Sequence, residues 1–159
     1  MTPAVKALQK AGIVHQILAY DHDPAADSYG LEAATLLGLD PASVYKTLVA
    51  VVADDQPVVA VVPVSTTLDL RALARAAGGK KAVMADPALA ERVTGYVVGG
   101  ISPIGQKRRL PTFVDDAAAD LATIHVSAGR RGLEVALTPA DLLAATGGQH
   151  RSIAKPADR

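Results

Sequence analysis

Lys46 is the charged residue whose surroundings in the sequence most suggest chemistry. It stands in the run from Val44 to Val52, which is apolar on both sides of an extended chain and is typical of a central, buried strand. Two interpretations are open. The ammonium extends along an apolar wall to water at the entrance of the strand, or it is partly desolvated in a pocket where it can hold a phosphate or carbonyl oxygen.

Two glycine-containing loops are the other candidates for chemistry. The stretch from Gly95 to Gly105 would expose backbone amides after a short strand and let a ligand approach the main chain, although such a pattern is usually a turn. The stretch from Ser127 to Gly132 contains Arg130 and Arg131. It predicts a hairpin turn with two solvated arginines or, alternatively, a loop that faces an anion.

The remaining composition excludes several kinds of site. The chain has no cysteine, so it has no disulfide, no cysteine zinc site and no thiol nucleophile of its own. The adjacent triplet Asp21, His22 and Asp23 would seldom point three ligands at one metal ion, and the four histidines are scattered. We therefore expect no metal and no cofactor.

Charge and hydropathy limit the partners. The 16 basic and 16 acidic residues give no net charge, which argues against broad electrostatic binding of nucleic acid and leaves room for a local contact. No apolar run approaches the roughly 20 residues of a membrane-spanning helix, and the first residues lack the plan of a signal peptide. We expect a cytoplasmic protein without a membrane segment.

The elements that must position these residues can be read from capping and periodicity. A Thr or Asp followed by proline predicts helix starts at Thr2, Asp40, Asp86 and Thr138, and a following glycine predicts helix ends. Three helix ranges follow: 3–11, 31–37 and 68–77. Runs rich in Val and Ile predict strands at 13–19, 44–53, 58–64, 82–84, 96–98, 112–114, 123–127 and 133–137, with a hairpin turn at 54–56.

This order predicts an α+β fold. We expect a single domain with a mixed, mostly antiparallel sheet, partly curled into a barrel, with short flanking helices. The domain should cover residues 1–146, and residues 147–159 should form a polar C-terminal tail that frays.

Several segments together resemble a known family. They are 1–5, 20–24, 44–48, 84–87, 95–107 and 126–132, in which Val44-Tyr45-Lys46-Thr47 and Gly99-Gly100-Ile101-Ser102-Pro103 are the most specific. In order and spacing they are similar to the YbaK/EbsC family of aminoacyl-tRNA deacylases, including its bacterial Cys-tRNA(Pro) deacylases, over nearly the whole chain.

The resemblance implies a free-standing editing enzyme. A pocket built for proline cannot strongly reject the near-isosteric cysteine, so a second protein must remove cysteine mischarged on tRNA(Pro). In this family the substrate's own thiol is understood to attack the ester carbonyl, giving a thiolactone and free tRNA. The implied partners are the CCA end of aminoacyl-tRNA and prolyl-tRNA synthetase.

The resemblance also implies site residues. The family's catalytic lysine falls on Lys46, where it would orient the terminal adenosine or its phosphate. An acidic position falls on Glu134, where close relatives carry Asp, so the role of this longer side chain stays open. The other positions, expected to line the substrate pocket, are Tyr20, Gly99, Gly100, Ile101, Ser102, Pro103, Ser127 and Gly129.

Two alternatives stay open. The same fold could edit another small mischarged residue, such as alanine on tRNA(Pro), by attack of water. The chain could also be a non-catalytic module that binds a synthetase or a nucleotide.

Overall fold

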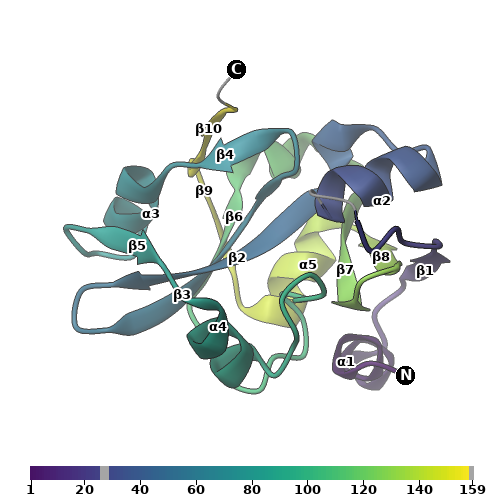
Figure 1. Ribbon diagram of the computed structural model, residues 1–159, viewed down its shortest axis with the longest axis horizontal. Coiled ribbons are helices and arrows are strands. Elements are labelled where there is room, and N and C mark those ends of the chain that lie inside the picture. Colours follow the sequence, from purple (N-terminus) through teal and green to yellow (C-terminus); the bar gives the residue numbers. More distant parts are fainter. Residues whose placement is uncertain (26–28, 158–159) are drawn as a thin grey trace.

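The computed structural model describes residues 1–25 and 29–157, and its helices surround strands in an α+β arrangement (Figure 1). In this part of the chain the α-helices are α1 (Pro3–Ala11), α2 (Tyr29–Leu37), α3 (Leu70–Ala76), α4 (Pro87–Thr94) and α5 (Pro139–Thr146). Short 3₁₀ helices are η1 (Pro41–Ser43) and η2 (Asp116–Asp120). The strands are β1 (Gln16–Ala19), β2 (Tyr45–Val52), β3 (Gln56–Pro63), β4 (Thr66–Leu68), β5 (Ala82–Met84), β6 (Thr112–Asp115), β7 (Ile124–Arg130), β8 (Leu133–Leu137), β9 (Gln149–Arg151) and β10 (Ala154–Pro156).

Helix caps explain most helix starts. The side chains of Thr2, Asp86 and Thr138 each accept a hydrogen bond from the amide three residues later, and a proline follows each cap. At Asp40 the prediction of a helix is only partly right, because the cap begins the three-residue η1. The third helix begins later than expected, since Asp69 caps α3 and the preceding residues form β4.

The strands form three sheets. The largest has the order β5-β2-β3-β6-β9, with β2 and β3 joined in an antiparallel hairpin and with parallel pairs β3–β6 and β6–β9. The others are β1-β8-β7 and β10-β4, both antiparallel. The mixed sheet is confirmed, and so is the turn before Gln56, where Asp54 and Asp55 have positive φ.

The predicted curl into a barrel is wrong. The sheet containing β2 and the sheet containing β7 meet through an isolated bridge between Val44 and His125 rather than through a ladder of hydrogen bonds. The strands therefore stay in separate sheets that do not close on one another.

The core lies on both faces of the hairpin β2–β3. On β3, Val59 and Val61 pack with α1, α4, α5 and β7, while Val58, Ala60 and Val62 pack with α3. The sequence predicted a strand buried on both faces at 44–52, but β3 is the strand buried along nearly its whole length, while four residues of β2 are only partly buried. The turn at Asp54 and Asp55 fixes the register of the hairpin, and with it the position of Lys46 near the start of β2.

Two further predictions need correction. Residues 96–98 form a turn instead of a strand, because Tyr96 is buried and its hydroxyl donates to the carbonyl of Ile104 at 2.6 Å. The C-terminal segment was expected to fray, yet β9 pairs with β6, β10 pairs with β4, and Ile153 is fully buried between them. Over the described residues, no helix is both long and apolar enough to cross a membrane.

Candidate functional site

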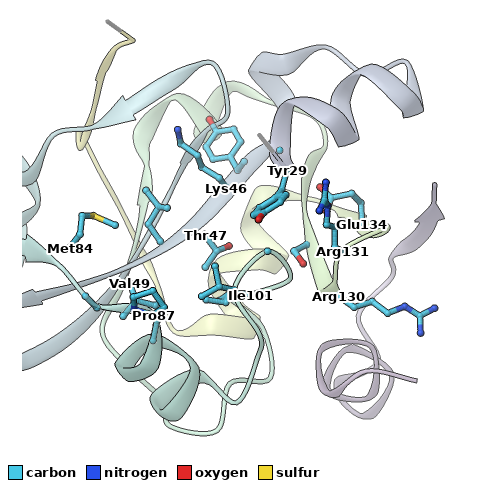
Figure 2. A pocket seen from close by; sticks show the side chains of 18 of the residues that line it. Tyr29, Lys46, Thr47, Val49, Met84, Pro87, Ile101, Arg130, Arg131 and Glu134 are labelled. Atoms are coloured by element: carbon cyan, nitrogen blue, oxygen red, sulfur yellow. The ribbon is translucent and has the colours of Figure 1, made fainter. Parts of the chain in front are cut away.

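A cavity of about 410 Å³ lies between β2, α2, the β7–β8 hairpin and the loop after α4 (Figure 2). Its lining is mostly apolar. The lining residues are Tyr20, Tyr29, Gly30, Tyr45, Lys46, Thr47, Leu48, Val49, Met84, Ala85, Pro87, Ala90, Val98, Gly99, Ile101, Ser127, Arg130, Arg131 and Glu134.

Six of the predicted site residues meet in this cavity although they come from five separate segments. Tyr20 follows β1, Lys46 lies on β2, and Ser127 and Glu134 are directly paired on β7 and β8. Gly99 and Ile101 belong to the loop after α4.

The four other predicted residues lie behind the cavity wall or elsewhere. Gly100 and Gly129 pack closely, since a Cβ on Gly100 would lie 2.6 Å from Cα of Arg130 and one on Gly129 would lie 2.8 Å from Cε1 of Tyr96. Ser102 is fully buried, and its hydroxyl accepts from the amide of Ile104. Pro103 lines a smaller cavity of about 170 Å³.

Backbone amides of the loop from Gly99 to Pro103 were expected to face the substrate, but one of them already has a hydrogen-bond partner within the protein. The N–H of Gly100 donates to the carbonyl of Val97 at 2.9 Å. It therefore cannot serve as a free donor, and the glycine is needed for the close backbone approach described above.

Lys46 combines the two interpretations made from the sequence. Its side chain is half-buried in the cavity wall, and its Nζ donates to the carbonyl oxygen of Thr66 at 2.7 Å. Burial lowers the pKa of the ammonium because desolvation disfavours the charged form. Lys46 makes no ion pair with any described residue, so its charge is available to an anionic or carbonyl ligand.

Glu134 supplies an acid on another side of the cavity. In Figure 2 it lies on the opposite side of Tyr29 from Lys46. The side chain is 6% exposed, and burial raises the pKa of its carboxyl from 4.5 to about 8. At neutral pH Glu134 is therefore largely protonated.

Arg131 and Tyr29 form a wall that the sequence predictions missed. The Arg131 guanidinium lies 4.3 Å from the centre of the Tyr29 ring and forms a 3.2 Å ion pair with Glu32 on α2. It also donates to the carbonyl of Asp23. The sequence offered only the suggestion of an anion-facing loop at Arg130 and Arg131, and it gave no signal for Tyr29.

Most of the remaining wall is apolar, and Thr47 is a polar exception. Figure 2 shows Val49, Pro87 and Ile101 close to Thr47 on one side of the cavity. The Thr47 hydroxyl is buried and has no hydrogen-bond partner among the described residues. It is free to bond to a ligand that enters the cavity.

Comparison with known proteins identifies the family. The model of the aminoacyl-tRNA editing domain matches residues 23–145. A protein of Enterococcus faecalis named "Putative Cys-tRNA(Pro)/Cys-tRNA(Cys) deacylase EbsC" is 43% identical over 120 residues, which cover 76% of this chain and 73% of that protein. The chain belongs to the aminoacyl-tRNA editing domain family.

Solved structures agree with the fold of this editing domain. A crystal structure described as "a putative trans-editing enzyme for prolyl tRNA synthetase" is 26% identical, with a TM-score of 0.84 over 96% of this chain and 95% of that one. A hypothetical protein, 22% identical, matches the fold with a TM-score of 0.85 over 96% of this chain and 99% of that one. The expected membership of the YbaK/EbsC deacylases is confirmed, and the editing domain is an aminoacyl-tRNA deacylase.

The side chains around the cavity decide which ligands it can hold. The sequence has no cysteine, and none of the described residues that line the cavity is a histidine. Among the described residues, no three His, Asp or Glu side chains gather closely enough to hold a metal ion. The cavity offers three cations, a buried acid and hydroxyl groups around an apolar floor, and these groups can bind and orient an ester.

Proposed function

We propose that this editing domain removes cysteine from mischarged tRNA(Pro) in trans, in the cytoplasm. The observation that carries the proposal is the half-buried Lys46 ammonium in the wall of a cavity that offers no thiol of its own. The similarity to EbsC and to the structure described as a trans-editing enzyme supports the choice of amino acid and tRNA.

Lys46 is the proposed catalytic residue. Its ammonium would contact the terminal adenosine or the ester oxygen, so that the carbonyl carbon meets the attacking atom. Tyr20, Ser127, Gly99 and Ile101 would line the aminoacyl and ribose portions. The 410 Å³ cavity suits such a fragment, because sites for small ligands fall in the range of roughly 300–1,000 Å³.

Glu134 is the proposed partner of the substrate's α-amino group. An ammonium placed beside the buried carboxyl would favour the ionised carboxylate and offset the desolvation that raises its pKa. The longer side chain at this position would reach further into the cavity than Asp.

In the proposed reaction the substrate supplies the nucleophile. The cysteine sulfur forms a bond to the ester carbonyl carbon, the bond from this carbon to the ribose oxygen breaks, and the thiol proton ends on that oxygen. The products are a thiolactone and tRNA with a free 3′ end. The enzyme contributes orientation and charge stabilisation.

Three matched substrates test this route. Deacylation of Cys-tRNA(Pro), Ala-tRNA(Pro) and tRNA(Pro) carrying S-methylcysteine is compared, with thiolactone sought by mass spectrometry. Fast release of cysteine with thiolactone, and slow release of the other two, is expected. Rapid release of alanine or S-methylcysteine would instead indicate attack by water. A rate equal to the enzyme-free blank for all three would indicate a non-catalytic module.

Association with prolyl-tRNA synthetase would supply tRNA selection. The balanced charge of the chain argues against strong independent binding of a whole tRNA. Adding synthetase should therefore restrict cleavage to Cys-tRNA(Pro) in a mixture with Cys-tRNA(Cys), measured as the ratio of the two rates.

A further inference from the structure

Three cations line the cavity, and they differ in what they contact. Lys46 donates to the carbonyl of Thr66, and Arg131 is held by Glu32, Tyr29 and Asp23. Arg130 is exposed, and its guanidinium has no hydrogen bond or ion pair with any described residue. The Arg130 guanidinium is therefore a cation at the cavity rim that no described residue neutralises.

The backbone holds Arg130 at that rim. The pairing of β7 with β8 is interrupted between Ser127 and Arg130, and Gly129 within this irregularity has a φ of 113°. Beyond it, the main chain of Arg130 packs against Gly100, whose added Cβ would lie 2.6 Å from Cα of Arg130. Figure 2 shows the guanidinium extending away from the cavity while the base of the side chain lies at its edge.

A ligand that is the end of a polymer must cross this rim. The cavity of about 410 Å³ can hold an aminoacyl group and part of one nucleoside, so the preceding nucleotides must lie outside it. Each of them adds one negative phosphate. An unpaired arginine at the edge offers a planar set of donors that matches a phosphate.

We propose that Arg130 binds a phosphate of the single-stranded RNA end that leads into the cavity. This inference rests on the proposed function and adds a residue to the recognition of its substrate. Arg131, next in sequence, builds the wall of the cavity, so the two adjacent arginines have different roles.

The experiment compares a polymeric and a single-nucleoside substrate. Steady-state kcat and KM are measured with Cys-tRNA(Pro) and with 3′-cysteinyl-adenosine, in the absence of synthetase, for the wild type, Arg130→Ala and Arg130→Lys. Arg71→Ala is the matched control, because Arg71 is an exposed arginine on α3 outside the cavity. Thermal unfolding verifies that each variant is folded.

Arg130→Ala should lower the ratio of kcat/KM for the tRNA to kcat/KM for the nucleoside by about 3- to 5-fold, the size expected of an exposed ion pair. The loss should lie in KM. The slope of log KM against log salt with tRNA should also fall by about 0.7, the contribution of one single-strand phosphate. Arg130→Lys should recover part of both effects, and Arg71→Ala should change neither.

An unchanged ratio and salt slope in Arg130→Ala would overturn the inference while leaving the proposed function intact. A loss of equal size with both substrates would also overturn it, because Arg130 would then act inside the cavity. If the wild type cleaves neither substrate, the proposed function itself is wrong. Activity of the wild type therefore distinguishes failure of the proposed function from failure of the Arg130 inference.

Discussion

The Nζ of Lys46 lies 2.7 Å from the main-chain oxygen of Thr66, so a neutral carbonyl holds the ammonium at the cavity wall. A carboxylate in that place would neutralise the charge and compete with a substrate oxygen. The carbonyl fixes the direction of the side chain and leaves its positive charge unbalanced. This hydrogen bond therefore orients the Lys46 side chain at the cavity wall.

Lys46→Ala should lower kcat/KM for Cys-tRNA by about 100-fold or more, the range found when one group that stabilises developing charge is removed. The fold should persist, because the substitution removes a half-buried charge rather than core volume. Lys155→Ala, on the exposed side of β10, is the control and should keep full activity. Full activity in Lys46→Ala would refute the catalytic assignment.

Glu134→Gln should make stability less dependent on pH. The carboxyl titrates near 4.5 when unfolded and at about 8 when folded, so between these values the native state binds more protons than the unfolded state. The free energy of unfolding of the wild type should fall across this window as pH rises, by up to on the order of 4 kcal/mol. Urea unfolding at pH 5, 6.5 and 8 checks this, and parallel pH profiles for the two proteins would contradict it.

Arg131→Ala should destabilise the protein by about 1–3 kcal/mol, because it leaves the nearly buried Glu32 carboxylate unpaired and uncovers the Tyr29 ring. The double variant with Glu32→Gln should recover part of this loss, which a double-mutant cycle measures. The neighbouring Arg130→Ala should change the free energy of unfolding by less than about 0.5 kcal/mol. Additive losses in the cycle would show that the ion pair is not the cause.

Gly100→Ala should cost about 1–3 kcal/mol and reduce activity, because its Cβ would meet backbone atoms of Arg130 and Arg131 at 2.6 and 2.8 Å. The loop after α4 would have to move away from the β7–β8 hairpin. Gly79→Ala is the matched control, since its Cβ would meet its nearest neighbour at 3.6 Å. Thermal unfolding and Cys-tRNA deacylation are measured for both, and equal effects would contradict the explanation.

Asp115→Ala should loosen the C-terminal strands. The Asp115 carboxylate accepts from the amides of Ile153, Ala154 and Ala117 at 3.0, 2.9 and 3.1 Å, so its loss leaves three donors unpaired. We expect a loss of about 2–4 kcal/mol and faster amide exchange in β9 and β10. Asp116→Ala, at the exposed neighbouring position, should do neither. Unchanged exchange in Asp115→Ala would refute the role of this carboxylate.

The sequence predicted features that depend on local chemistry. The caps at Thr2, Asp86 and Thr138, the hairpin turn at Asp54 and the buried run around Lys46 all depend on near neighbours. The family resemblance then indicated six residues that meet in the cavity.

Features set by distant contacts were not predictable in this way. The side chain of Tyr96 reaches Ile104 and so breaks what looked like a strand. Residues 149–156 join two sheets because Asp115, far away in the sequence, accepts hydrogen bonds from the amides of Ile153 and Ala154. The wall of Tyr29 and Arg131 likewise depends on how α2 packs against the β7–β8 hairpin.

The parallel pairing of β9 with β6 also has a consequence for synthesis. The chain is synthesised from its N-terminus, so β6 leaves the ribosome before β9. One edge of β6 therefore stays unpaired until residues 149–151 have been synthesised and can pair with it. The same delay holds for β4, which pairs with β10. A nascent chain that stalls before these residues leaves the edges of β6 and β4 that face β9 and β10 unpaired, so β9 and β10 protect the protein from edge-to-edge aggregation.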